Sequence, residues 1–206
     1  MNLKPISLDR EDYLRPTDIL DWTDPAVLAL ARSLVSEEEN SLATARRCFE
    51  WVRDRIRHSV DFRMNPVTCS ASEVLRAGTG FCYAKSHLLA ALLRANGIPT
   101  GLCYQRLCLD ETKKWFGLHG LVAVGLEGGE WYRCDPRGNK PGVEALFEPP
   151  VECLAFPLQE PGECDYSEIW PDPLPCVVEV LRHSSSWEVA QENLPDAPEA
   201  LGRFSS

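Results

Sequence analysis

The sequence has no apolar run long enough to cross a membrane and no visible export signal. None of its segments approaches the roughly 20 apolar residues that a bilayer-spanning helix needs. Residues 1–5 begin a polar, proline-containing arm, not an apolar segment followed by a small-residue cleavage site. These two absences predict a cytoplasmic protein that has no membrane partner.

The cysteines lack the spacing of a metal site. The chain has nine cysteines but no C-x-x-C pair, and the other intervals differ from the usual zinc-ligand spacing. An odd number of cysteines in a protein expected in the cytoplasm also argues against a disulfide framework. We therefore expect eight of them to be small buried hydrophobic residues, and we predict neither a metal nor a cofactor.

The sequence also lacks the basic surface that binds nucleic acid. Residues 1–150 are nearly neutral, with 20 acidic and 19 basic side chains, whereas residues 151–206 carry 11 acidic and 2 basic ones. A nucleic-acid partner is therefore not predicted. We expect the acidic segment to be a solvated flank; the alternatives are a docking surface for a basic partner and a lid over the active site.

Hydrophobic periodicity predicts helices in the first half of the chain, followed by strands. The helix at 81–95 is apolar throughout 88–93, which places it at the centre of the fold. The period then changes to that of strands, and Gly128 and Gly129 connect two of them as a hairpin. Residues 1–150 are predicted to form the core, and 151–206 a proline-rich extension with short helices packed on it. The remaining predicted elements are helices at 25–35, 41–58, 70–77, 175–182 and 186–193, and strands at 100–109, 116–126 and 131–135.

Cys82 is the cysteine expected to be chemically reactive. It follows a turn that contains Gly78 and Gly80, and it occupies the first turn of the apolar helix. Unpaired backbone N–H groups and the positive end of the helix dipole favour a thiolate there, and the thiolate is the nucleophilic form of cysteine. His119 and Asp135 follow on the next strands, in an order that suggests acyl-transfer chemistry.

The central part of the chain, from about 70 to 138, resembles the transglutaminase-like superfamily, in particular its small bacterial members described as transglutaminase-like or cysteine-protease-like. Four segments carry the resemblance: Gly-Thr-Gly-Phe-Cys at 78–82, Leu-Leu-Arg-Ala-Asn-Gly-Ile-Pro at 92–99, Leu-His-Gly at 118–120 and Trp-Tyr-Arg-Cys-Asp-Pro at 131–136. The resemblance implies a papain-like α+β core, with the nucleophile at the start of a central helix that packs on an antiparallel sheet.

The same resemblance implies a catalytic triad. Cys82 would be the nucleophile, His119 would exchange protons with it and with the leaving amine, and Asp135 would orient the imidazole. The backbone N–H of Cys82 is a candidate donor to the oxyanion. No side-chain donor can be assigned from the sequence; Gln105 is polar and lies on the adjacent strand, but nothing supports that role.

The triad requires a particular hairpin register. A two-residue turn at Gly128 and Gly129 would point His119 and Asp135 to opposite faces of the sheet, because side chains alternate along a strand. A three-residue loop at 127–129 would make them diagonal neighbours on one face. We therefore predict the three-residue loop, with Gly129 in a left-handed conformation.

The other polar residues near the predicted site have simpler interpretations. His58 is read as a cation at the negative end of a helix, and His87 lies too far around its helix from Cys82 to be the base. His183 is in the acidic segment and has no visible partner. Lys85 is on roughly the same face as Cys82 and could support a thiolate, although a solvated lysine is an equal alternative.

The predicted function is a cysteine enzyme that acts on amide or peptide bonds through a thioester. Hydrolysis of a peptide, a protein or a small amide is favoured, because crosslinking needs a second substrate that outcompetes water. The alternatives are an acyltransferase that forms amides and a non-catalytic binding module.

Overall fold

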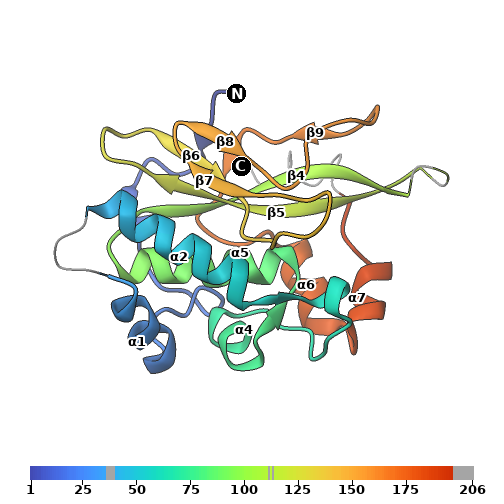
Figure 1. Ribbon diagram of the computed structural model, residues 1–206, viewed down its shortest axis with the longest axis horizontal. Coiled ribbons are helices and arrows are strands. Elements are labelled where there is room, and N and C mark those ends of the chain that lie inside the picture. The colour runs from blue at the N-terminus through green and yellow to red at the C-terminus, as the bar shows by residue number, and fades with distance from the viewer. Residues whose placement is uncertain (36–39, 111, 113, 197–206) are drawn as a thin grey trace.

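The computed structural model describes residues 1–35, 40–110, 112 and 114–196. A four-stranded antiparallel sheet, with strand order β6-β5-β4-β9, covers helix α5, and most of the helices lie on that same side of the sheet (Figure 1). The strands of this sheet are β4 (Thr100–Asp110), β5 (Trp115–Gly125), β6 (Trp131–Cys134) and β9 (Cys164–Asp165). The predicted α+β architecture is confirmed.

Helix α5 (Cys82–Ala95) is the centre of the core. It contacts β4 and β5 on one side and three other helices on the other. Its residues from Leu88 to Leu93 are all fully buried, because neighbours surround this apolar run on every side. The surrounding helices are α1 (Pro25–Ser33), α2 (Ser41–Arg55) and α4 (Ala71–Ala77).

Capping residues begin and end the helices close to the predicted positions. Asp24 accepts hydrogen bonds from the first backbone N–H groups of α1, and Pro25 occupies its first turn. Ser70 and Glu73 form a reciprocal capping box at the start of α4. Gly78 ends α4 with a φ of 66°, a left-handed conformation that glycine adopts without steric cost. In the described part of the chain, no helix is long and apolar enough to span a bilayer.

A short parallel pair of strands lies just before α5. Strand β2 (Arg57–His58) pairs with β3 (Thr79–Gly80), so that His58 is opposite Gly80. The short helix α3 (Ser59–Phe62) follows β2 directly. The pairing joins the segment after α2 to the turn that leads into Cys82.

The segment after residue 150 is built into the fold. Hairpin β7–β8 (Leu146–Glu148 and Val151–Cys153) spans that position, and β9 extends the main sheet beside β4. The last strand, β10 (Glu168–Ile169), pairs with β1 (Lys4–Pro5). Helices α6 (Pro175–His183) and α7 (Trp187–Glu192) follow near their predicted positions. The short 3-10 helix η1 (Arg10–Tyr13) completes the elements. The division into a core and an extension stays a prediction.

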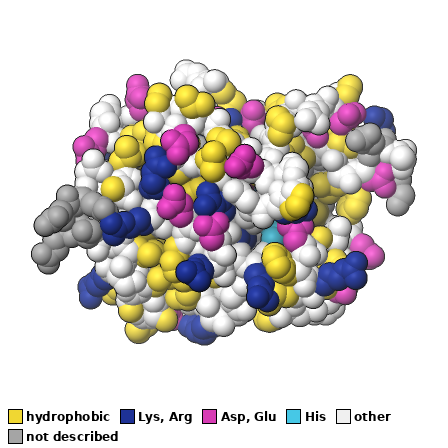
Figure 2. All heavy atoms as spheres, in the orientation of Figure 1, with side chains coloured by type: hydrophobic (Ala, Val, Ile, Leu, Met, Phe, Trp, Pro, Cys, Tyr) yellow, Lys and Arg dark blue, Asp and Glu magenta, His cyan; other side chains and the backbone are white. Residues whose placement is uncertain are grey.

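Several acidic groups of this segment are paired with basic side chains. Glu152 and Asp165 each bind Arg133 at 2.7 Å, and Asp196 binds Arg106 at 2.6 Å. Figure 2 shows acidic and basic side chains interspersed on the face in view. These ion pairs connect the segment to β4 and β6, and the expectation of a solvated flank stays a prediction.

Candidate active site

Cys82 is the first residue of α5 and is 7% exposed. Its sulfur accepts a hydrogen bond from the backbone N–H of Gly120 on β5, at 3.5 Å. Position 120 has to be glycine for this contact, because an added β-carbon would lie only 2.8 Å from the ring of Tyr83. The missing side chain at Gly120 thus lets β5 approach the start of α5.

The hairpin between β5 and β6 has the predicted register. Val122 faces Cys134, and Leu126 pairs with Glu130 across the three-residue loop at 127–129. Gly129 has a φ of 87°, in the left-handed region, as predicted. The register places the residue after Cys134, which is Asp135, on the same face as His119.

His119 and Asp135 are joined directly. The Nε2 of His119 lies 2.7 Å from a carboxylate oxygen of Asp135. Asp135 is fully buried, and it also accepts hydrogen bonds from the backbone N–H groups of Arg137 (3.0 Å) and Ala155 (3.2 Å). Since Nε2 binds Asp135, Nδ1 is the ring nitrogen that remains for Cys82. The structure brings the three predicted residues together.

The charges in this group stabilise one another. Burial opposes a charge on His119, but the negative charges of Asp135 and Cys82 outweigh it and raise the pKa of His119 to about 10. Burial likewise opposes the charge of Asp135, but the nearby His119 and the two backbone donors lower the pKa of Asp135 below its usual value. The arrangement therefore favours an imidazolium between a carboxylate and the sulfur.

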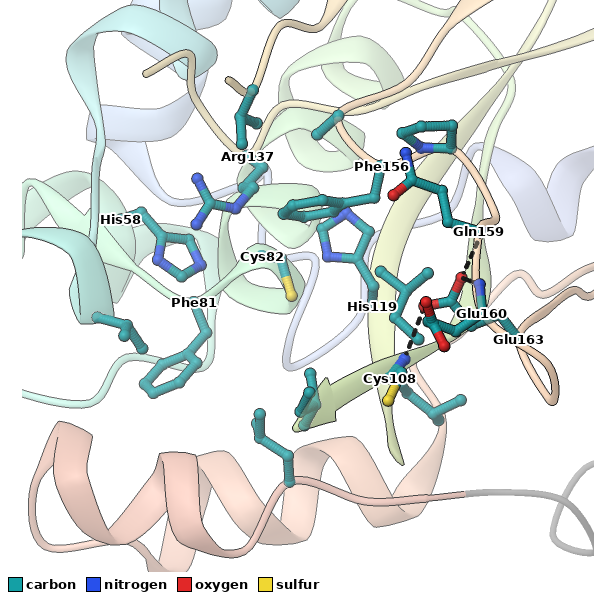
Figure 3. A pocket seen from close by; sticks show the side chains of 18 of the residues that line it. His58, Phe81, Cys82, Cys108, His119, Arg137, Phe156, Gln159, Glu160 and Glu163 are labelled. Carbon is teal, nitrogen blue, oxygen red and sulfur yellow. Dashed lines mark hydrogen bonds between the residues drawn. The ribbon is translucent and has the colours of Figure 1, made fainter. Parts of the chain in front are cut away.

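Cys82 and His119 open onto a pocket of about 400 Å³. Figure 3 shows the rings of His58 and His119 on opposite sides of the Cys82 sulfur. Apolar side chains contributed by several elements, among them Leu107, Leu118 and Leu194, line other parts of the pocket. A pocket of this kind can hold a substrate acyl group next to the sulfur.

Sequence reasoning did not find the residues after 150 that shape this pocket. The ring of Phe156 packs edge-on against His119, with ring centroids 5.1 Å apart, and the guanidinium carbon of Arg137 lies 5.2 Å from the centroid of the Phe156 ring. A lone aromatic residue in a proline-rich segment carries no sequence signal for such a contact, because the contact depends only on the tertiary fold.

The interpretation of His58 as a cation at a helix terminus is wrong. Helix α2 ends at Arg55, and His58 lies in β2 with only 8% of its surface exposed. Burial, followed by the charge of Arg137, lowers the pKa of His58 to about 3. His58 is therefore a neutral ring in the wall of the pocket.

The other histidines lie away from the reacting sulfur. His87 is buried, and its Nδ1 lies 2.8 Å from the carbonyl of Cys69, which agrees with its exclusion as the base. The expectation that His183 has no partner is wrong, because its Nδ1 lies 2.9 Å from the carbonyl of Glu179, one turn earlier in α6. Neither residue lines the pocket.

Lys85 and Gln105 have structural partners. Lys85 is fully buried, so the solvated alternative is wrong; its amino group binds the carbonyls of Arg53 (3.2 Å) and Ile56, and burial lowers its pKa to about 7. The side-chain amide of Gln105 donates to Asp165 (3.0 Å) and to the carbonyl of Phe156 (3.3 Å). Both of its N–H donors are thus engaged away from Cys82.

All nine cysteines lie in the described part of the chain and are free thiols. Within residues 1–35, 40–110, 112 and 114–196, no group of three or more His, Cys, Asp or Glu side chains could hold a metal ion.

Comparison with known proteins identifies the family of this chain. The model of the transglutaminase-like superfamily matches residues 28–136, more than half of the chain. The chain belongs to the transglutaminase-like superfamily. Membership of this superfamily supports an enzyme at the family level. No curated protein matches the sequence.

Solved structures that are similar to part of this chain include proteins from three organisms. A candidate cysteine protease from Cytophaga hutchinsonii matches with a TM-score of 0.50 and 21% identity over 64% of this chain and 43% of that one. The periplasmic domain of TgpA from Pseudomonas aeruginosa matches with a TM-score of 0.47 and 19% identity, over 64% of this chain and 48% of that one. A candidate protease from Parabacteroides distasonis matches with a TM-score of 0.41 and 14% identity, over 68% of this chain and 30% of that one. The matched region spans less than half of each of these chains.

Proposed function

We propose that this protein is a cysteine enzyme that cleaves amide or peptide bonds through a thioester on Cys82. The observation that carries the proposal is the buried contact of 2.7 Å between His119 and Asp135, on the wall of the pocket that also contains the Cys82 sulfur. A nucleophile, a base and a group that orients the base are the parts that acyl transfer requires.

The first half of the reaction forms the thioester. The sulfur of Cys82 adds to the substrate carbonyl carbon, and the electron pair of the C=O double bond moves to the oxygen. The backbone N–H of Cys82, unpaired at the start of the helix, is a donor to that oxygen. The C–N bond then breaks, and His119 gives its proton to the departing amine.

The second half removes the acyl group. His119, now neutral, takes a proton from water, and the resulting hydroxide adds to the thioester carbonyl. The C–S bond breaks, the acid product leaves, and the proton on His119 restores the imidazolium beside the thiolate. Asp135 holds the ring in place and stabilises its charged form in both halves.

Hydrolysis is favoured over transfer of the acyl group to an amine. Transfer requires a second substrate that occupies the site in place of water. The proposed substrate is a peptide, a protein or a small amide. An acyltransferase that forms amides is the alternative. The products formed from acylated Cys82, with and without added glycine methyl ester, distinguish the two activities. A hydrolase releases the free acid in both cases, whereas an acyltransferase forms the amide of the added amine.

The first test compares thiols within the same protein. Cys108 is partly exposed and lines the same pocket, so it is a matched control for reagent access. At pH 6.5 we expect iodoacetamide to alkylate Cys82 at least ten times faster than Cys108, with each adduct located by mass spectrometry. The variant His119→Ala should remove the difference. Equal rates for Cys82 and Cys108 in the wild type would favour a non-catalytic binding module instead.

A further inference from the structure

His58 belongs to the pocket but has no part in the proposed triad. Strand β2 places it opposite Gly80, two residues before Cys82, and its ring packs edge-on against Phe81 with centroids 6.0 Å apart. The backbone that carries the nucleophile therefore also fixes His58. Figure 3 shows its ring across the Cys82 sulfur from His119.

The imidazole of His58 is buried without a hydrogen bond to any described residue. Its Nδ1 is inaccessible to solvent and unpartnered, and the nearest carboxylate oxygen, on Asp61, is 3.9 Å away. Buried polar groups without partners are rare, because leaving one unpaired costs about as much as a lost hydrogen bond. Nε2 is therefore the ring nitrogen of His58 that can meet a substrate in the pocket that this residue lines.

The surroundings of His58 keep its ring neutral. Burial and then Arg137 lower its pKa to about 3, while the opposing effect of Asp61 is weaker. Asp61 is itself neutralised by Arg137 and Lys140, each at 2.7 Å. A neutral ring that carries its proton on Nε2 leaves a bare lone pair on the buried Nδ1. A neutral imidazole can polarise a carbonyl oxygen without carrying a charge of its own.

We propose that the Nε2–H of His58 and the backbone N–H of Cys82 together form the oxyanion hole of this enzyme. The inference rests on the proposed function. When the sulfur adds to the carbonyl carbon, both donors bind the oxygen that receives the electron pair. When the C–N bond breaks, the pair returns to form the C=O bond of the thioester. No proton leaves His58 in either step.

Other side chains near Cys82 are already engaged. The guanidinium of Arg137 is paired with Asp61, and the amide of Gln105 donates to Asp165 and to Phe156. His58, by contrast, makes no hydrogen bond with a described residue.

Two small reagents distinguish an oxyanion donor from a residue that affects the reactivity of the Cys82 sulfur itself. p-Nitrophenyl acetate acylates a thiolate through a tetrahedral oxyanion, whereas iodoacetamide alkylates it by direct displacement of iodide, without one. An oxyanion donor therefore affects only the first reaction. The variants are His58→Leu, which removes the donor, and His58→Gln, which places an amide N–H near the position of Nε2. The exposed His183 provides the control variant His183→Gln.

We expect His58→Leu to slow acylation of Cys82 by about 100-fold and to leave its alkylation within about threefold of the wild type. His58→Gln should recover at least tenfold of the lost acylation rate, and His183→Gln should match the wild type in both reactions. If His58→Leu does not fold, as judged by its thermal melt, His58→Asn takes its place, because its shorter amide does not reach the position of Nε2.

Three results would overturn the inference. The first is an unchanged rate of acylation in His58→Leu or its replacement His58→Asn. The second is an equal loss of acylation and alkylation rates in that variant. The third is a His58→Gln variant that is acylated no faster than the variant without a donor. A parallel loss would mean that His58 positions Cys82 instead. Failure of the proposed function is recognised separately, because Cys82 would then react no faster than Cys108 in the wild type with either reagent.

Discussion

His58 and His119 line the same pocket and are similarly buried, with 8% and 6% of their surfaces exposed, yet their pKa values move in opposite directions. Burial lowers the pKa of His58 to about 3, with Arg137 adding to the effect. For His119, the charges of Asp135 and Cys82 overcome burial and raise the pKa to about 10. A charged partner in contact, and not burial alone, decides whether a ring in this pocket carries a charge.

The two sides of the pocket also come from different parts of the chain. The His58 side is assembled before α5, from the pairing of β2 with β3. The His119 side depends on residues after 150, since Phe156 packs on the ring and the backbone of Ala155 donates to Asp135. The segment that sequence analysis treats as an extension thus supports the charged histidine.

Removal of residues 151–206 should have the largest effect and should abolish cooperative folding. The truncation takes away β9 from the edge of β4, and it takes buried core residues such as Ile169, Trp170 and Val177. Their burial is a major source of stability. Thermal and urea unfolding of fragment 1–150 measures the effect. A fragment that melts cooperatively near the full-length temperature would contradict this prediction and would make the segment a separable appendage.

The variant Asp135→Asn should make His119 resemble His58. Without the carboxylate, only Cys82 still opposes the effect of burial, so the pKa of His119 should fall well below 10, as seen by NMR of the ring protons. Acylation of Cys82 by p-nitrophenyl acetate at pH 7 should fall by about 10³-fold or more. The control variant Asp172→Asn removes an exposed carboxylate that binds Arg15 and should leave the rate unchanged. A His119 pKa that stays near 10 in Asp135→Asn would contradict the comparison.

The pH dependence of stability should separate the two histidines. The pKa of His58 is about 3 in the folded state and about 6.5 when unfolded, so the unfolded state binds more protons between these values. Stability is therefore lost as the pH falls below 6.5, by up to about 1.4 kcal/mol per pH unit for this group. His119, with a raised pKa, loses its contribution only as the pH rises from 6.5 towards 10.

Urea unfolding of the wild type and of His58→Gln between pH 4.5 and 6.5 measures the contribution of His58 to the pH dependence of stability. The variant should show a shallower loss of unfolding free energy in acid. His87→Gln is the matched comparison, because burial lowers the pKa of His87 to about 4 and its effect has the same sign. Identical slopes for the wild type and His58→Gln would show that His58 is not held neutral.

The smallest effect is expected for Arg137→Met. It removes the cation that adds to burial in lowering the pKa of His58, so this pKa should rise towards the usual histidine value, while Asp135 keeps that of His119 high. NMR titration of both rings measures the two values in one experiment. The control variant is Arg57→Met, which removes an exposed cation that stacks on Phe62. An equal rise in the pKa of His119 would contradict the conclusion that different neighbours set the pKa values of His58 and His119.

Local sequence determined the helices and the hairpin. Asp24 and Ser70 begin helices because their side chains satisfy backbone N–H groups nearby in the chain, and Gly78 ends one because it adopts a positive φ. The loop length at 127–129 followed from the alternation of side chains along strands, since only an odd loop puts His119 and Asp135 on one face. These features depend on neighbours in sequence, so the sequence alone predicts them.

The tertiary structure alone decided the state of single polar residues. The sequence places His58 just after a helical pattern, but its pairing with Gly80 and the position of Arg137, 79 residues away, make it a buried neutral ring. Phe156 and the buried amine of Lys85 likewise acquire their partners only on folding. Periodicity reports which face of an element is apolar, but not which distant group will pack over a given polar side chain. For that physical reason, Cys82, His119 and Asp135, which meet beside the pocket, could be named from the sequence, while the charges around them could not.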